Sequence, residues 1–269
     1  MKQPAYPAGS HDSIQYHFFC EDKLFAMRIF RSDSLEHTSA WVFDGSARAV
    51  LASEARITQK SVDHLDLWSS SMTLAASESG GRITIAADNA DDSFEVEFVL
   101  GTTFNWGYDA LNADELVFHQ PDLACAVTFR GKKMTGHGYC KRYYWKHSPR
   151  YWGYRFLQGF IDERKTSLWT ADAMFGTSKY DYFKLLGQDG ALVEMPTDTC
   201  AHKQNLMFGY IDGVRHEARF EELGAWNQIL KSSVMDSHMQ QRYGKVSYFD
   251  GTNVRTGVAI TEYCFGTLG

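Results

Sequence analysis

Residues 136–156, GHGYCKRYYWKHSPRYWGYRF, form a segment that is unusually rich in aromatic and basic side chains. Trp145 and Trp152 offer ring faces whose quadrupole attracts a cation. Arg142 carries a planar fork of N–H donors that suits a carboxylate. These residue types can hold a charged or polarised small molecule. Two plainer interpretations stay open, because tryptophan commonly fills a core and a basic run commonly faces solvent.

Short stretches that alternate between apolar and polar residues recur along the chain and predict β-strands. They are rich in β-branched and aromatic residues, and they cover residues 14–20, 24–30, 39–43, 82–87, 93–100 and 124–130. Residues 78–82, 88–92, 130–133, 187–190 and 210–216 have the Gly, Asp and Asn content of hairpin turns. Helical periodicity is weak, with short candidates at residues 63–70 and 235–243. The sequence therefore predicts an all-β, antiparallel protein with few short helices.

The character of the sequence changes near Gly131. The first half carries most of the Ser, Ala and Asp, whereas aromatic and basic residues become dense between residues 136 and 160. We therefore expect an N-terminal β-domain over residues 1–130 and a C-terminal one over residues 131–269. Two barrels or two strongly bent sheets would give each half an interior, and a barrel of about eight strands is wide enough for one small ligand.

The overall composition excludes several classes of protein. A net charge of −6 is unlike that of a nucleic-acid binder. The five cysteines are scattered, with no C-x-x-C pair, and this pattern favours a reducing, cytoplasmic compartment. No stretch approaches the ~18 apolar residues of a transmembrane helix, although a peripheral membrane contact stays compatible with the composition. The ten histidines lack ligand spacing, so we expect no metal site.

Residues 136–156 resemble the G-x-G-Y…W…W-G stretch of the AttH-like family, which includes carotenoid 1,2-hydratase (hydroxyneurosporene synthase) and is similar to the fungal lipocalin-like pericyclases. LVFHQPDLACAVTFRGKKMTGHGY (116–139), LWTADAMFG (168–176) and TGVAITEYCFG (256–266) agree with this resemblance, which covers residues 116–269. It implies two tandem lipocalin-like antiparallel β-barrels, a hydrophobic pocket, and neither a metal nor an organic cofactor.

In the hydratases of this family, an H-x-W and a Y-x-D are thought to protonate an isoprenoid double bond. By position Trp145 matches the tryptophan and Asp172 the aspartate, whereas Tyr143 and Thr170 replace the histidine and the tyrosine. Carotenoid hydration is therefore one alternative among several. The resemblance implies a catalytic set of Asp172, Tyr143 and Trp145. As substrate-binding residues it implies Arg142, Trp152, Tyr139, Thr170 and His147.

The chemistry of Asp172 depends on which way it faces. A carboxyl group in an apolar cavity keeps its proton and can act as a general acid, but the same strand face can equally be solvated. Glu262, in the last predicted strand, suits a structural role.

Three functions are compatible with these residues. The first is a cofactor-independent hydratase, cyclase or isomerase acting on a hydrophobic polyene, terpenoid or polyketide-like substrate. The second is a lipocalin-like carrier of a hydrophobic molecule, without catalysis. The third is a structural β-protein with a filled interior. A cavity next to Asp172 would favour the enzyme, because a carrier gains nothing from an unneutralised buried acid.

Overall fold

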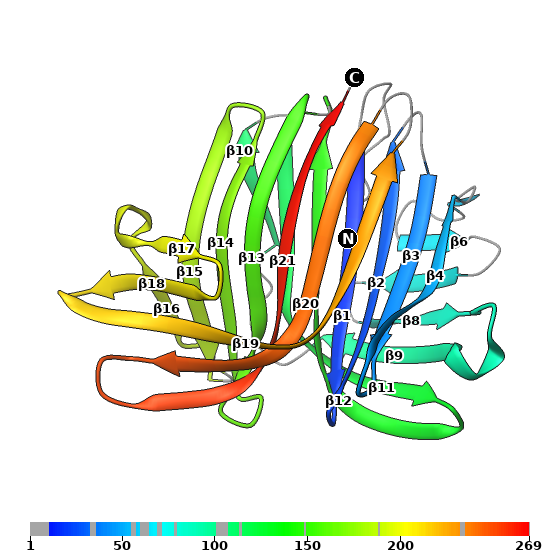
Figure 1. Cartoon of the computed structure of the whole chain (residues 1–269), viewed down its shortest axis with the longest axis horizontal. Helices are drawn as coiled ribbons and strands as arrows, with labels where there is room; N and C mark the ends of the chain where they lie inside the picture. The colour runs from blue at the N-terminus through cyan, green and yellow to red at the C-terminus, as the bar shows by residue number, and fades with distance from the viewer. Residues whose placement is uncertain are drawn as a thin grey trace. The chain divides into compact units, whose positions relative to one another are not determined.

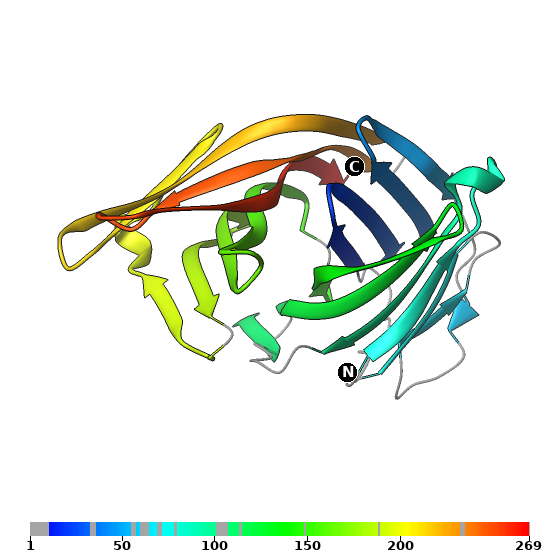
Figure 2. The same cartoon turned by 90° about the horizontal axis from the view of Figure 1, so that it is seen from below.

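The structure is a computed structural model and describes residues 11–32, 36–54, 58–59, 65–68, 72–77, 80–100, 107–112, 115–147, 149–187, 189–231 and 235–268. Within these residues the regular structure is β-strand, apart from two single 3₁₀ turns, η1 (Ala90–Asp92) and η2 (Thr197–Thr199). The chain divides into two compact units, unit 1 (Met1–Ser148) and unit 2 (Pro149–Gly269). Each is built on one curled antiparallel sheet (Figures 1 and 2), and the all-β prediction is confirmed.

Unit 1 pairs its first described strand with its last. Its strands are β1 (His11–Cys20), β2 (Lys23–Ser32), β3 (Glu36–Phe43), β4 (Ala47–Glu54), β5 (Thr58–Gln59), β6 (Leu65–Trp68), β7 (Met72–Ser77), β8 (Gly80–Ile85), β9 (Phe94–Leu100), β10 (Gly107–Asn112), β11 (Glu115–Phe129) and β12 (Lys132–Trp145). The described strands lie in the order β4-β3-β2-β1-β12-β11-β9-β8-β7-β6-β5, and β10 pairs with β11. Placing β1 against β12 brings the N-terminal meander beside the hairpin of β11 and β12.

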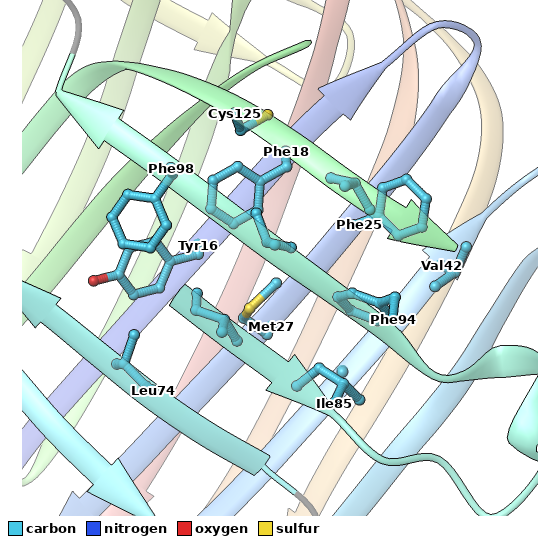
Figure 3. Close-up of a cluster of buried hydrophobic side chains, with 14 of the residues drawn as sticks. Tyr16, Phe18, Phe25, Met27, Val42, Leu74, Ile85, Phe94, Phe98 and Cys125 are labelled. Atoms are coloured by element: carbon cyan, nitrogen blue, oxygen red, sulfur yellow. The ribbon is translucent and has the colours of Figure 1, made fainter. Parts of the chain in front are cut away.

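The curl of unit 1 encloses a hydrophobic core (Figure 3). Phe25 of β2 and Phe94 of β9 are not on neighbouring strands, yet their ring centroids lie 5.2 Å apart. Tyr16 and Phe98 meet in the same way, at 5.3 Å. These contacts need both alternation along each strand and curvature of the sheet, because a flat sheet would hold the rings apart. The described side chains inside the curl of unit 1 therefore pack into one hydrophobic core.

Unit 2 follows the same plan with its own set of strands. They are β13 (Tyr151–Ile161), β14 (Thr166–Phe175), β15 (Ser178–Gly187), β16 (Leu192–Met195), β17 (Ala201–Lys203), β18 (Leu206–Ile211), β19 (Val214–Lys231), β20 (Met235–Phe249) and β21 (Val254–Leu268). Their order is β16-β15-β14-β13-β21-β20-β19-β18-β17. Phe183 of β15 lies 6.1 Å from Tyr248 of β20, measured between ring centroids, so this sheet also curls.

One face of the unit 2 sheet, here called the inner face, carries the core of that unit. Leu157, Leu168 and Phe183 belong to this core and are almost completely buried. The opposite face of β13 carries Phe156 and Phe160, which are also buried. Because both faces of this strand are apolar, its sequence cannot show which face points into the curl.

Two expectations differ from the structure. Residues 235–243 lie in strand β20, where Met235, Ser237, Met239 and Gln241 alternate as the buried positions, and pairing on both sides by β19 and β21 overrides the weak helical pattern. Likewise, the centre of residues 63–70 is strand β6, and the ends of that range lie outside the described residues.

The division between the units also lies elsewhere than at residue 131. The turn at Arg130 and Gly131, both with positive φ, joins β11 to β12 inside unit 1. The change in composition near Gly131 therefore marks a hairpin, whereas the compact units divide after Ser148.

No helix in the described part of the chain is long and apolar enough to cross a membrane.

Candidate functional site

A row of polar side chains crosses the inner face of unit 2 from β19 to β15. Directly opposed residues on antiparallel strands project to the same side of a sheet. The register therefore places these residues in one line, called here the polar row: Asn227, Gln240, Tyr263, Arg155, Asp172 and Asp181. Gln240 Nε2 donates a 3.0 Å hydrogen bond to Asn227 Oδ1 at one end.

Two carboxyl groups, Asp172 and Asp181, lie side by side at the other end of the polar row. Burial raises the pKa of Asp172 above its usual range, and the facing carboxyl of Asp181 raises it further; Lys179 and Arg155 oppose the shift. Lys179 Nζ lies 3.1 Å from Asp181 Oδ2, within ion-pair distance. The pair thus combines one carboxyl group whose pKa is raised with one that is ion-paired to a lysine, an arrangement suited to general acid catalysis.

Arg155 stands beside Asp172 at the centre of the row. Its Nη1 donates to the backbone oxygen of His202 at 3.3 Å, and its guanidinium carbon lies 5.4 Å from the centroid of the Tyr263 ring. Burial lowers the pKa of His202 to about 4, so its imidazole is neutral at pH 7. Its Nε2 is buried without a hydrogen-bond partner among the described residues, so this nitrogen can still form a hydrogen bond.

A row of apolar side chains, called here the apolar row, runs alongside the polar row and nearer the edge of the inner face. The register aligns Ile229, His238, Phe265, Gly153 and Met174 across five strands. Ile229, Phe265 and Met174 are 62%, 47% and 44% exposed, and a side chain at Gly153 would meet no atom within 4 Å. The polar row is therefore bordered by an accessible apolar surface.

A cavity of about 330 Å³ opens beside the polar row, near the lower end of the range of volumes for ligand sites. It is lined by Arg155, Phe156, Lys203, Gln204, Met207, Gln240, Arg242, Thr261, Glu262 and Tyr263. Glu262 is buried and accepts hydrogen bonds from the Tyr154 hydroxyl, at 2.6 Å, and from Gln241 Nε2. These bonds hold the glutamate between strands, as its expected structural role requires. Arg155 belongs both to the cavity and to the polar row, so it links the two.

The predicted site residues are divided between the units. Tyr139, Arg142, Tyr143 and Trp145 are buried on β12 in unit 1, and His147 is exposed just beyond that strand. Trp152, Thr170 and Asp172 belong to unit 2.

Within unit 1, the predicted residues make different kinds of contact. The Tyr143 and Trp145 rings stack with centroids 5.8 Å apart, and the Tyr143 hydroxyl lies 3.2 Å from His119 Nε2. Arg142 instead donates from Nε to Asp12 Oδ1 at 2.8 Å and forms a second bond to the same carboxylate. Because this guanidinium is bound within a buried ion pair, Arg142 serves the unit 1 interior.

Within unit 2, Thr170 shares the inner face with Asp172, and Trp152 does not. Thr170 is completely buried, and its hydroxyl has no hydrogen-bond partner among the described residues. Trp152 lies on the other face of β13, since it is an odd number of residues from Arg155. The alternation predicted for β14 thus places the threonine and the aspartate together.

The glycines of the G-x-G-Y motif have a packing role in unit 1. A Cβ atom at Gly136 would come within 2.1 Å of the Phe19 backbone oxygen, and one at Gly138 within 2.4 Å of the Phe18 ring. Both positions therefore allow β12 to approach β1 closely. This part of the resemblance reflects the fold rather than the chemistry.

Sequence reasoning missed Asp181, Arg155, His202, Lys203 and Arg242. One signal was available: Asp181 alternates with the apolar residues Phe183 and Leu185 in β15, so a carboxylate stands at an inward position. On the other face of β15, Tyr182 and Leu186 are also apolar and buried, so the sequence does not show which face points inward. No three His, Cys, Asp or Glu side chains of the described residues gather closely enough to hold a metal ion.

Comparisons with known proteins show where this fold occurs. The sequence matches no model of a protein family and no curated protein. A solved structure of a candidate AttH from Nitrosomonas europaea has a TM-score of 0.63 and 13% sequence identity, covering 95% of this chain and 92% of that one. Kievitone hydratase from Nectria haematococca gives 0.56 and 11%, and CghA with Sch210972 gives 0.57 and 9%; each covers 95% of this chain and 88% of its own. This chain shares its fold with these three proteins.

Proposed function

We propose that the chain is a cofactor-independent enzyme of the hydratase, cyclase or isomerase type, which uses Asp172 as a general acid on a hydrophobic small molecule. The observation that carries the proposal is the raised pKa of Asp172, which faces Asp181 on the inner face of unit 2. A carboxyl group that binds its proton more tightly because of burial and a neighbouring carboxyl is costly for a protein that only carries a ligand, and it is useful for one that protonates it.

The proposed first step is proton transfer from Asp172 to a double bond or carbonyl of the substrate. The carboxyl group of Asp181 and the face of the Tyr263 ring then offset the positive charge that develops. Attack by water, ring closure or loss of a different proton completes hydration, cyclisation or isomerisation. In each case the proton released at the end returns to Asp172, so no net proton is consumed.

The apolar row supports the proposed substrate class. Phe265, Met174 and Ile229 offer accessible apolar surface beside the acid pair, where the body of a polyene, terpenoid or polyketide-like molecule can lie. Similarity to the fold of a protein named kievitone hydratase, and to that of CghA with Sch210972, supports this chemistry. Tyr143 and Trp145 stay sequence-based candidates for the same reaction.

The test is to identify what co-purifies with the protein. Native mass spectrometry followed by solvent extraction is applied to the wild type, to Asp172→Asn and to the control Asp212→Asn. Asp212 lies in an exposed turn with a φ of 50°, which asparagine also adopts, so the control removes a carboxylate without disturbing the fold. We expect one product in the wild type and the control, and its unreacted precursor in Asp172→Asn.

The same unaltered ligand in all three proteins would contradict the acid role. It would favour the alternative function of a lipocalin-like carrier, which uses the cavity without the chemistry.

A further inference from the structure

The cavity of unit 2 is lined by more positive than negative charge. Arg155, Lys203 and Arg242 supply three cations, whereas the carboxylate of Glu262, the single acid in the lining, belongs to the opposite face of β21, because Glu262 lies next to Tyr263 in the strand. That carboxylate already accepts two hydrogen bonds, from Tyr154 and Gln241. The lining therefore has an excess of hydrogen-bond donors that carry positive charge.

The most buried of these cations, Arg242, is held mainly by neutral acceptors. Its three donors reach Thr261 Oγ1 at 3.0 Å, Asn205 Oδ1 at 2.8 Å and the Gln204 backbone oxygen at 3.0 Å. The Glu222 carboxylate lies farther away, 3.6 Å from Nη1, and is 43% exposed. These bonds fix the orientation of the guanidinium, and its one carboxylate partner among the described residues is distant and partly exposed, although the arginine itself is only 8% exposed.

The other two cations have fewer partners within the described residues than Arg242 has. Among the described residues, no carboxylate lies within ion-pair distance of Arg155 or Lys203; the nearest acid along the row is Asp172, opposite Arg155 on β14. Within the same part of the chain Arg155 donates a single hydrogen bond, to a backbone oxygen, and keeps the rest of its planar fork for another partner.

The remaining walls are apolar. Met207 and the ring of Tyr263, which share the inner face with the cations, line the same cavity. We infer that this cavity binds an amphipathic organic acid, with its carboxylate between Arg155 and Arg242 and its apolar body against these walls and the apolar row. This inference rests on the proposed function, because it names the substrate class of the same site.

A matched pair of probes tests the inference without turnover. Octanoate and 1-octanol have the same chain length and differ in charge, and the affinity of each is measured by isothermal titration calorimetry at pH 7.5. We expect the wild type to bind octanoate about tenfold more tightly than 1-octanol, as one or two charge-assisted hydrogen bonds would give.

Two variants locate the preference. Arg155→Gln and Arg242→Gln are each expected to bring the octanoate to octanol ratio close to one while the affinity for 1-octanol stays unchanged. Arg155→Gln keeps the test open should loss of the Arg242 bonds to the Gln204–Asn205 turn unfold the unit. Lys165→Gln, which removes a cation from an exposed turn, is expected to retain the wild-type ratio.

Equal affinities of the wild type for the two probes would overturn the inference, as would a proportional loss of both in Arg155→Gln. Displacement of octanoate by an equal concentration of inorganic phosphate would assign the cations to a phosphate instead. The two proposals can fail separately. If the wild type prefers octanoate but the same ligand co-purifies with wild type and Asp172→Asn, only the acid role is refuted. If different ligands co-purify with these two proteins but the wild type does not prefer octanoate, only the carboxylate site is refuted.

Discussion

The interiors of the two units are built from the same curled sheet and are used differently. Inside unit 1, rings such as Tyr16, Phe25 and Phe98 pack in the core within the curl, and the ion pair of Asp12 with Arg142 is mutually neutralised and almost fully buried. Inside unit 2, the apolar core ends before the polar row begins. There the pKa of Asp172 is raised, and Arg155 has no carboxylate within ion-pair distance in the described part of the chain.

This difference separates stability from function. A filled interior gains from every buried methylene group, and its charges must pair. An open interior can keep groups in unfavourable states, because the ligand and the solvent compensate them, and such states are the ones that bind and react. Changes in unit 1 should therefore cost stability, whereas changes along the polar row should alter binding and chemistry at little cost in stability.

The largest effect is expected when the buried ion pair of unit 1 is broken. Asp12→Ala leaves the Arg142 guanidinium buried without its carboxylate, and we expect the free energy of unfolding to fall by about 3–5 kcal/mol. Urea denaturation followed by circular dichroism measures this change. The double variant Asp12→Leu with Arg142→Met should recover much of the loss, because it removes both charges. A double variant no more stable than Asp12→Ala would show that the pair matters through other contacts.

A smaller loss of stability is expected at acid pH, and we expect a buried histidine of unit 1 to cause much of it. Burial lowers the pKa of His11 to about 3, with a further contribution from Arg28, whereas an unfolded chain has a histidine pKa near 6.5. Between those values the unfolded chain binds the extra proton, so stability falls as the pH drops through this window.

The variant His11→Phe tests this pH dependence. It keeps a ring against Phe30 and Trp145 and removes the titration. Between pH 7 and pH 5 the wild type should therefore lose about 2 kcal/mol more of its free energy of unfolding than His11→Phe loses. Urea denaturation at both pH values measures the difference. Parallel pH profiles for the two proteins would mean that His11 is not kept neutral by burial.

The fold could be predicted more completely than the site, because strands and turns follow from patterns among residues that are close together in the sequence. Alternation and turn residues are sufficient to place strands such as β1, β2 and β9, and the glycines of residues 136–138 point to a close strand approach. The polar row depends on register between strands far apart in sequence: Arg155 meets Tyr263 only because β13 pairs with β21, and Asp172 meets Asp181 only because the β14–β15 hairpin turns at Gly176. The resemblance points to Asp172, whereas the alternation that would mark Asp181 is hidden by the buried apolar residues on the other face of β15.

The smallest effect, a gain in stability on removing Asp172, would most directly sharpen the contrast between the two interiors. A raised pKa means that the folded chain holds this proton more tightly than the unfolded chain, so ionisation destabilises the fold as the pH rises above the ordinary value near 3.8. Asp172→Asn should therefore melt slightly higher than the wild type at pH 7, by about 1–3 °C. The gain should disappear near pH 3, where both states are protonated. Because Asp172 is only half-buried, water screens part of the penalty and the shift is small.

Calorimetry at both pH values measures these melting temperatures. A lower melting temperature for Asp172→Asn than for the wild type at pH 7 would mean that this carboxyl stabilises unit 2, and it would contradict a pKa raised by burial.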